Sequence, residues 1–450
     1  MVSPFLEEVR SLFIPPEDPQ RDPMVARAYT MAHVLPSDSE DLWHHEEAAA
    51  WTLYRTYQDE GLTPEGALLL SDLLGRGLLS GGLTAEVTRW HDPRFTGFDG
   101  NLNEDKALLD HLRQAWEGRP LSPTKLDSYG KCPYQFFAGQ VLGLEAPEKE
   151  MMEITPMDRG SLTHRVLERF YRERWDAGAG RARPVTEGAA AEATAAILRI
   201  AEEVCAVFEQ QGRAGHPGAW GYEKRHLRVR LRWFIQSEIE HFKDNPGLAP
   251  AHLEFSFGVR DHRGADPAST DDPLILSSGK GEVWARGIID RIDAFPDGRA
   301  MVIDYKTGKY VPAYGDIYAG ISFQLALYLL AAERLLGHHP QKGFYLMVAQ
   351  PPGTKGGLSQ HGQLSCGEKP GRKGQLGWPA LRERVLDFLS AYASDISAGH
   401  FPVLPVSADP EGEACRYCDF GSACRVDEAR LILNKTEDQD RFARIRRRNA

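Results

Sequence analysis

The sequence predicts a mixed α/β (α+β) fold in which helices flank a small set of strands. Segments 251–260, 281–294, 299–306 and 342–349 are rich in apolar, β-branched and aromatic residues, which favour strands. Amphipathic helical patterns separate these segments, and helices on both sides of a short strand set indicate a layered sandwich. The length of 450 residues suggests two or three domains.

Helical periodicity covers much of the remaining chain. We expect helices over 46–60, 64–79, 103–117, 123–139, 158–175, 186–211, 222–244, 320–336 and 378–398. The Gly-, Pro- and Ser-rich stretches 261–279 and 351–377 are expected to be loops. We expect three parts, namely a helical region over 1–117, a mixed α/β domain over 118–430 and a basic tail over 431–450.

Composition narrows the class of protein. No apolar run is long enough to span a bilayer, and the amino terminus lacks the features of a secretory signal, so we expect a cytoplasmic protein. The formal charge of −11 argues against a protein that coats nucleic acid generally, while a local basic cleft is still compatible with DNA binding. There is no G-x-x-x-x-G-K-[ST] phosphate loop, so ATP hydrolysis is not expected.

Two acidic residues and a lysine are predicted to meet on one β-hairpin. The Pro-Asp-Gly triplet Pro296–Gly298 favours a reverse turn, so we expect 281–306 to form a hairpin. If the triplet forms the loop, Asp290 lies opposite Asp304 with Cβ atoms about 5 Å apart, and Lys306 shares their face. Such a group can bind a divalent metal and activate water for phosphodiester cleavage. The alternative is an ordinary polar hairpin with a surface ion pair.

Four cysteines form a second candidate site. Cys415, Cys418 and Cys424 are close in the sequence, and Cys132 is a distant fourth. In a chain without a secretory signal, this spacing indicates metal ligation more than disulfide bonds. The C-x-x-C spacing suits tetrahedral zinc and an iron–sulfur cluster equally well. Either would act as a structural staple, because it would close a very long loop.

Four further residues are candidates to support the hairpin. His164 lies at the border of the apolar stripe of an expected helix, where imidazole can be a metal ligand or an ordinary structural residue. Gln324 and Tyr328 share one helix face and could orient the lysine or touch a phosphate, or simply form surface hydrogen bonds. Glu254 could supply another carboxylate, and an exposed strand position is the alternative.

Basic and aromatic residues offer possible contacts to nucleic acid. The basic groups are Lys224, Arg225, Arg228 and Arg232 on an expected helix, Lys355, Lys369, Arg372 and Lys373 in the second loop, and Arg441, Arg444, Arg446, Arg447 and Arg448 in the tail. Each could bind phosphates, although a solvated surface explains any one of them equally well. The aromatic candidates for base stacking are Tyr129, Tyr134 and Phe137, with core packing as the alternative for Phe137.

The ordered set of motifs resembles the RecB-type branch of the PD-(D/E)XK nucleases. The likeness is greatest to the carboxyl-terminal nuclease domain of AddB-type helicase–nuclease subunits, and it covers about residues 120–426. The matching segments are Leu121–Leu126, Cys132–Phe137, Gly160–His164, Gly287–Asp293, Asp304–Gly308, Gln324–Tyr328 and Cys415–Cys424. Each segment is weak evidence alone, whereas their order is specific. The resemblance implies a restriction-endonuclease-like mixed sheet flanked by helices.

The resemblance also implies roles for the residues of the hairpin. His164, Asp290 and Asp304 would bind the catalytic Mg²⁺ or Mn²⁺, with help from the carbonyl of Tyr305. Lys306 would position or activate the attacking water and stabilise the developing charge on the phosphate.

The remaining motif residues receive accessory and structural roles from the same resemblance. Gln324 and Tyr328 match an accessory motif that supports the catalytic site and the DNA. The four cysteines, Cys132, Cys415, Cys418 and Cys424, match the ligands of a 4Fe–4S cluster, which favours that cluster over zinc.

The implied activity is exonuclease cleavage of DNA, with single-stranded DNA the favoured substrate, in double-strand-break processing. A full AddB-type subunit carries large helicase-like domains before this region, and residues 1–117 resemble only the stretch that precedes the nuclease. A larger AddA-type helicase subunit is the implied partner. Three alternatives stay open at this point: a CRISPR-associated exonuclease, which is usually shorter, a non-catalytic DNA-binding or scaffold subunit, and a cysteine-rich zinc protein of unrelated fold.

Overall fold

The computed structural model of the chain describes two compact units, which comprise residues 1–89 and 90–450. The described residues are 51, 68, 71–73, 75–77, 80–116, 118–145, 154–260, 266–278, 281–308, 311–348, 351, 360–367, 375–406 and 413–424. The helix expected over 46–60, most of that over 64–79, the basic residues of the second loop and the arginine-rich tail lie outside them. The expected domain limits near 118 and 430 stay a prediction.

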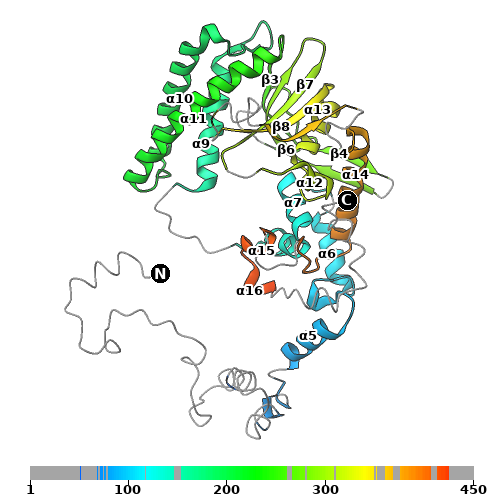
Figure 1. Cartoon of the computed structure of the whole chain (residues 1–450). Coiled ribbons are helices and arrows are strands. Elements are labelled where there is room, and N and C mark those ends of the chain that lie inside the picture. Colours follow the sequence, from blue (N-terminus) through cyan, green and yellow to red (C-terminus); the bar gives the residue numbers. More distant parts are fainter. Residues whose placement is uncertain are drawn as a thin grey trace, which may run out of the picture. The chain divides into compact units, whose positions relative to one another are not determined.

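A five-stranded mixed sheet is the scaffold of the second unit (Figure 1). Its strands are, in spatial order, β3 (Ala249–Phe257), β6 (Gly287–Ala294), β7 (Arg299–Lys306), β8 (His339–Met347) and β9 (Gln360–Ser365). Strands β7 and β8 run parallel, and the other neighbours are antiparallel. A parallel pair needs a crossover connection, which here contains α12 (Tyr314–Tyr318) and α13 (Gln324–Leu336). The expected mixed α/β fold is confirmed.

Helices cover both faces of this sheet (Figure 1). One face packs on α9 (Pro156–Glu173), α10 (Ala190–Gln210) and α11 (Pro217–Asp244). The other face packs on α7 (Pro123–Lys131), α13 and α14 (Trp378–Ser397). Because both faces are covered, the central strand β7 is apolar at successive positions, with Val302 facing one layer and Ile303 the other.

The hairpin of β6 and β7 has the expected turn and register. The N–H of Phe295 donates to the carbonyl of Arg299 (2.8 Å), which leaves Pro296–Gly298 as the loop. Gly298 has a φ of +86°, a conformation that glycine adopts without strain. Arg291 then pairs with Ile303, and the pairing continues to Ala294 and Ala300 next to the turn.

The expected strand over 281–294 was wrong as one continuous element. It is divided into β5 (Gly281–Ala285), which pairs with β4 (Leu274–Ser278) in a separate two-stranded sheet, and β6. Arg286 leaves the ladder between them, and its N–H donates to the carbonyl of Leu121 (3.0 Å). Strands β4 and β9 also lie in the stretches 261–279 and 351–377 that were expected to be loops throughout.

The helix expected over 123–139 is interrupted. Cys132 ends α7 in an extended conformation (φ −162°, ψ 117°), since the following proline disfavours the helical conformation at this position. A short helix α8 (Pro133–Phe136) and a π-helical turn η4 (Phe137–Val141) follow.

The remaining elements are short or lie at the edges of the unit. They are α5 (Ser80–His91), η3 (Gly97–Asp99), α6 (Lys106–Trp116), β1 (Trp175–Asp176), β2 (Arg181–Ala182), η5 (Glu187–Ala189), α15 (Glu413–Arg416) and α16 (Gly421–Cys424). None of the described helices is long and apolar enough to cross a membrane.

Candidate active site

The backbone ladder between β6 and β7 opens at the candidate site. The ladder ends with the pair of Arg291 and Ile303, one residue before Asp290 and Asp304. Beyond this point, side chains bind the backbone of Tyr305. Its N–H donates to Oδ2 of Asp290 (2.7 Å), and its carbonyl contacts a ring nitrogen of His164 (3.1 Å). Strand β7 keeps its parallel pairing with β8, so one edge of β7 is held while the other is free to form a site.

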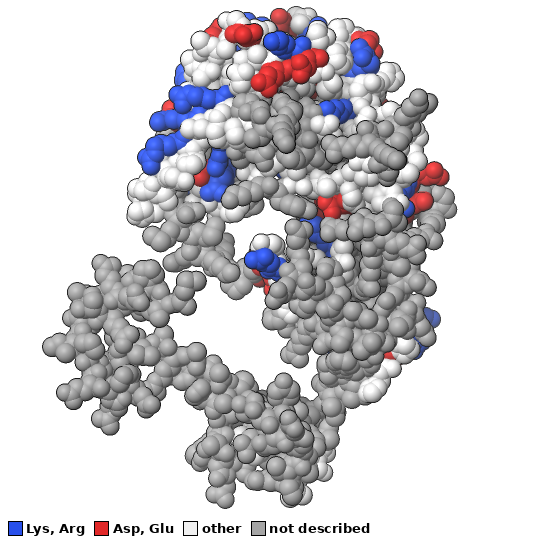
Figure 2. All heavy atoms as spheres, viewed as in Figure 1, with Lys and Arg blue, Asp and Glu red and all other residues white. Residues whose placement is uncertain are grey.

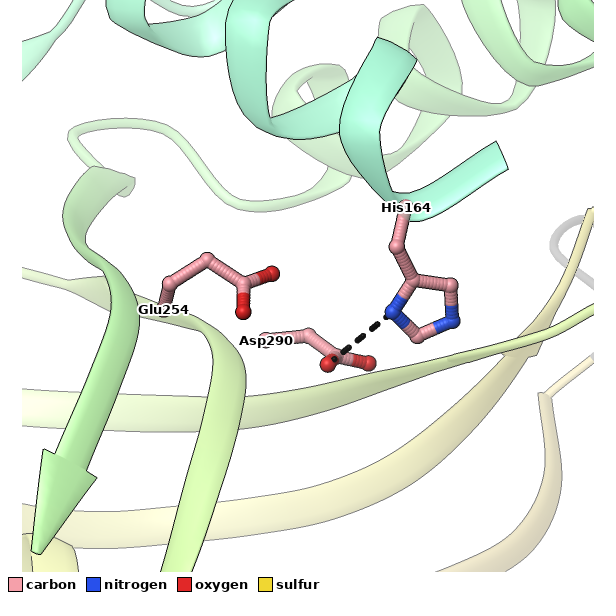
Figure 3. A group of neighbouring side chains, drawn as sticks. All are labelled: His164, Glu254 and Asp290. Atoms are coloured by element: carbon pink, nitrogen blue, oxygen red, sulfur yellow. Dashed lines mark ion pairs between the residues drawn. The ribbon is translucent and has the colours of Figure 1, made fainter. Parts of the chain in front are cut away.

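Helix α9 brings His164 to this opening. Thr155 caps the helix by accepting the N–H of Asp158 (3.0 Å), and a proline follows at the first helical position, so the start of α9 is well defined. Nδ1 of His164 lies 3.2 Å from Oδ1 of Asp290 (Figure 3). Both ring nitrogens of His164 therefore face oxygen atoms of the two hairpin strands.

Glu254 of β3 completes a group of three possible metal ligands. One ligand atom from each of His164, Glu254 and Asp290 lies within 4.8 Å of the other two (Figure 3). Glu254 has a φ of +54°, and among the described residues only glycines share a positive φ with it. Such strain costs about 1–3 kcal/mol and persists where the surroundings enforce it. Asp266 does so here, because its Oδ2 accepts the N–H of Leu253 (3.1 Å) and its own N–H donates to the carbonyl of Glu254 (3.4 Å).

The carboxylates of the site repel one another in a partly buried environment. Burial and the charge of Asp290 raise the pKa of Glu254 to about 8. The same two causes raise the pKa of Asp304 to about 6, although Lys306 opposes the shift. For His164, burial lowers the pKa, but the surrounding carboxylates outweigh it and raise the pKa to about 9. A cation is thus strongly favoured at this position.

A second group links the lysine to α13. Nζ of Lys306 lies 2.7 Å from Oδ2 of Asp304 and donates to Oε1 of Gln324 (2.9 Å). The amide nitrogen of Gln324 donates to Oδ1 of Asp304 (2.8 Å) and to the hydroxyl of Tyr328 (3.3 Å). Only glycine fits at 287, because a Cβ there would lie 2.9 Å from the Tyr328 ring. Asp304 is 2 % exposed, so the alternative of a surface ion pair is wrong.

The donor set fits a divalent cation that prefers oxygen. Three carboxylates, one imidazole and one backbone carbonyl are available, which suits Mg²⁺ or Mn²⁺. Each carboxylate oxygen of Asp304 already has a partner, but a second lone pair on each can still bind a metal. The expected ligands His164, Asp290, Asp304 and Tyr305 therefore surround one opening. Their roles as ligands stay a prediction, and Glu254 joins them from the structure.

The cysteine segments lie against each other. A Cβ at Gly139, in the turn after α8, would lie 3.4 Å from the ring of Phe420, between Cys418 and Cys424. Burial raises the pKa of the Cys132 thiol to about 12, and the nearby Cys424 adds to this shift. Burial and Cys424 also raise the pKa of Cys418. Cys424 is therefore close enough to both Cys132 and Cys418 to influence their charge.

The family comparison decides the class of this fold and site. The model of the PD-(D/E)XK nuclease superfamily matches residues 120–425. The chain belongs to this superfamily. The match includes the opened hairpin, the helix that carries His164 and all four cysteines, so the expected membership is confirmed.

Curated relatives of this PD-(D/E)XK nuclease chain are named as AddB-type subunits of an ATP-dependent helicase/deoxyribonuclease. The relative from Moorella thermoacetica is 30% identical over 302 residues, which cover 63% of this chain and 25% of that protein. The relative from Clostridium novyi is 26% identical over 418 residues, which cover 79% and 35%. The chain thus spans between a quarter and about a third of the length of these relatives. A solved structure titled "Crystal structure of SSO0001" is 14% identical with a TM-score of 0.27, and covers 71% of this chain and 94% of that one.

The predicted aromatic contacts are largely wrong. Tyr129 is buried, and its hydroxyl donates to the carbonyl of His400 (2.8 Å). Phe137 stacks on Phe401 with ring centroids 5.0 Å apart. Both side chains serve the packing of this nuclease domain, and only the partly buried Tyr134 is left as a candidate for base stacking.

The predicted basic stripe of α11 divides between two faces of the helix. Lys224 and Arg228 form ion pairs with Glu209 and Glu202 of α10, each at 2.7 Å, so their charge is neutralised. Arg232 lies on another side of α11, and it is exposed.

Sequence reasoning missed a buried ionic cluster behind the opened hairpin. Arg291 is fully buried, and its guanidinium donates to Glu238 of α11 (2.8 Å), to Asp293 (2.8 Å) and to the hydroxyl of Tyr305 (2.9 Å). His241 of α11 contacts Asp293 at 2.9 Å. The only signal in the sequence was the alternation of charged residues at 291 and 293 in an otherwise apolar strand.

We predict that Glu254→Gly separates the stability of the fold from metal binding. Glycine accepts a positive φ, so the free energy of unfolding in metal-free buffer should stay level or rise by up to about 1 kcal/mol. The affinity for Mn²⁺, measured by isothermal titration calorimetry, should fall because one carboxylate is lost. The Glu254→Ala control loses the same carboxylate but keeps the strain, and should be the less stable variant. Unchanged Mn²⁺ affinity in both variants would remove Glu254 from the site.

Proposed function

We propose that this chain is a metal-dependent deoxyribonuclease that hydrolyses phosphodiester bonds. The observation that carries the proposal is the opened end of β6 and β7, where Asp290, Asp304 and Lys306 meet His164 of α9. Membership of a nuclease superfamily supports it. A Mg²⁺ or Mn²⁺ ion held by His164, Asp290, Asp304 and the Tyr305 carbonyl, with Glu254 beside it, would act as a Lewis acid on the scissile phosphate.

Lys306 has the geometry of the group that handles the attacking water. Its ammonium is held by Asp304 and by the amide oxygen of Gln324, so it has a defined position at the edge of the opening. A fixed positive charge there orients a water for in-line attack and offsets the charge that develops on the phosphate. Gln324 keeps the lysine and the carboxylate in register, and Tyr328 supports Gln324 from the next turn of α13.

We propose single-stranded DNA as the substrate, bound along the exposed face of α11. On this face Tyr222 is 55% exposed and Val229 is 42% exposed. The rings of Tyr222 and His226 stack with centroids 4.1 Å apart. Arg225 and Arg232 flank them, and neither has an ion pair with another described residue. Figure 2 shows several Lys and Arg side chains over α10 and α11. Exposed aromatic rings between free arginines are typical of surfaces that stack bases and bind phosphates.

This face of α11 starts close to the candidate active site. Glu223, the neighbour of Tyr222, pairs with Arg159 of α9 at 3.1 Å. His164 follows on α9, less than two turns after Arg159. A strand bound along α11 would therefore lead towards the hairpin, which supports exonuclease action on single-stranded ends.

We propose that the four cysteines hold a 4Fe–4S cluster as a structural staple. A single tetrahedral zinc with Zn–S bonds of about 2.3 Å would need sulfur atoms about 3.8 Å apart. Of these cysteines, all of them among the described residues, no three place their sulfur atoms within 4.8 Å of one another. The wider spacing favours a polynuclear cluster, and Cys132 would connect it to α7.

The biological role that we propose is double-strand-break processing together with a larger AddA-type helicase subunit, in the cytoplasm. The names of the curated relatives, each a helicase/deoxyribonuclease subunit, support this role. A non-catalytic DNA-binding or scaffold subunit is disfavoured, because Asp304, Lys306 and Gln324 keep mutual contacts that DNA binding alone does not require. Residues 80–116, which precede the matched region and include α5 and α6, disfavour a short CRISPR-associated exonuclease.

We predict that Asp304→Ala and Lys306→Ala each reduce cleavage of labelled single-stranded DNA in Mg²⁺ by at least about 100-fold. Each removes a group that acts on the phosphate or the water, while the packing of the sheet is kept. Melting curves and DNA binding should change little. Asp297→Ala in the turn of the same hairpin is the matched control and should cleave normally. Cleavage retained in both site variants would refute the assignment of the active site.

For the cluster, we predict that Cys418→Ala loses iron and lowers the melting temperature. The staple then no longer ties its segment to α7, so the loss of constraint should exceed the effect of one side chain. Iron content and visible absorbance of protein purified without oxygen provide the measurement. Cys366→Ala, outside the four cysteines, should keep its iron. A full iron content in Cys418→Ala would mean that Cys418 is not a ligand.

For the DNA path, we predict that Arg225→Gln combined with Arg232→Gln weakens binding of single-stranded DNA several-fold. Because the double variant can no longer bind two of the phosphates, the slope of log K against log salt should fall by about 1.4 in magnitude, from ~0.7 per phosphate. Fluorescence anisotropy over a salt series measures both quantities. Lys224→Gln combined with Arg228→Gln removes the same charge from the paired side and should bind almost normally. Equal losses of affinity in both double variants would show that α11 acts only through its net charge.

A further inference from the structure

Helix α7 connects the cysteine segment to the candidate active site. It starts at the Ser122 cap, which accepts the N–H of Lys125, and it ends at Cys132. In the middle of α7, Oδ1 of Asp127 accepts the N–H of Phe323 (2.8 Å). Phe323 is the cap residue of α13, and Gln324 is the first residue of that helix. Asp127 thus binds the peptide group directly before the residue that holds Lys306 and Asp304.

The contact between α7 and the turn before α13 is rigid. At Gly130 a Cβ would lie 2.3 Å from the carbonyl oxygen of Gly320, so the two backbones touch directly. The hydroxyl of Tyr392 on α14 donates to the same carbonyl (2.9 Å). Because side chains cannot absorb a shift at this contact, a displacement of α7 would move the residues that lead into α13.

Asp127 is an unusual group to find in this position. Burial raises its pKa to about 7, against the lowering effects of the Phe323 N–H and of Lys131 and Lys306. The carboxyl group is therefore close enough to Lys306 to influence its charge. Among the described residues it forms no ion pair with Lys or Arg, and the hydrogen bond to Phe323 is its link to the active site. Side-chain capping of α13 by its own cap residue is absent, since that residue is Phe323.

We propose that Asp127 is a positioning residue for phosphodiester hydrolysis. It fixes the start of α13, so that Gln324 can hold Lys306 and Asp304 together, and it transmits the position of α7 and of Cys132 to the site. This inference rests on the proposed nuclease function. It adds a residue outside the hairpin and α13 to the groups on which the rate depends, and it gives the cysteine staple a physical route to the chemistry.

Two variants of the full chain with its cluster test the proposal. Asp127→Ala removes the acceptor for the Phe323 N–H, whereas Asp127→Asn keeps an oxygen that can accept it. We expect kcat on single-stranded DNA to fall by about 10–100-fold in Asp127→Ala, the range for residues that orient a catalytic group, with KM and iron content unchanged. Asp127→Asn should restore most of the rate. Thr124→Ala, at an exposed position of α7, is the matched control and should leave kcat unchanged.

A second measurement does not need cleavage. Hydrogen–deuterium exchange in the peptide that covers residues 321–328 should be faster in Asp127→Ala than in Asp127→Asn or the unchanged protein, while exchange in β7 and β8 stays the same. If the unchanged protein does not cleave DNA, the proposed function fails, and this exchange pattern still decides whether Asp127 positions α13. An unchanged kcat with unchanged exchange in Asp127→Ala would overturn the inference. So would equal losses of iron, stability and activity in both Asp127 variants, because that result indicates a structural role alone.

Discussion

The site depends on the early end of one backbone ladder. Strands β6 and β7 separate after the pair of Arg291 and Ile303, and the backbone of Tyr305 is then bound by side chains. A continuous ladder would have used these polar groups and closed the space. Asp290 forms one of the side-chain bonds that replace the ladder, and His164 forms the other. The two residues that keep the strands apart are therefore also the candidate ligands, which joins the geometry of the sheet to its chemistry.

An opened ladder needs support from behind, and the buried cluster around Arg291 provides it. The guanidinium ties β6 to α11 through Glu238 and to β7 through the hydroxyl of Tyr305. A buried charge without partners would be very costly, so these bonds also fix the strands relative to the helices. Tyr305 is held at both ends, with its side chain on this cluster and its backbone on the metal-binding side. The strain at Glu254 is enforced in a similar way by Asp266 from the neighbouring segment.

Local signals were sufficient for the hairpin, because a Pro-Asp-Gly turn fixes the register and the register aligns Asp290 with Asp304. The break at Arg286 could not be predicted, since its cause is a hydrogen bond to Leu121, far away in the sequence. For the same reason the positive φ of Glu254 and the contact of Asp127 with α13 were not visible. The basic spacing on α11 gave the correct helix but the wrong partners, because the acidic residues of α10 that neutralise two of these charges face them only after folding.

The most direct test of this account is a crystal structure with Mn²⁺, with the ion located by its anomalous scattering. The opened ladder predicts one strong peak between β6, β7 and α9, within coordination distance of Asp290, Asp304 and His164. The lysine should still contact Asp304 and Gln324 in that structure. A peak bound elsewhere, or strands β6 and β7 paired continuously through Asp290 and Asp304, would contradict the central claim that the separation of these strands creates the metal site.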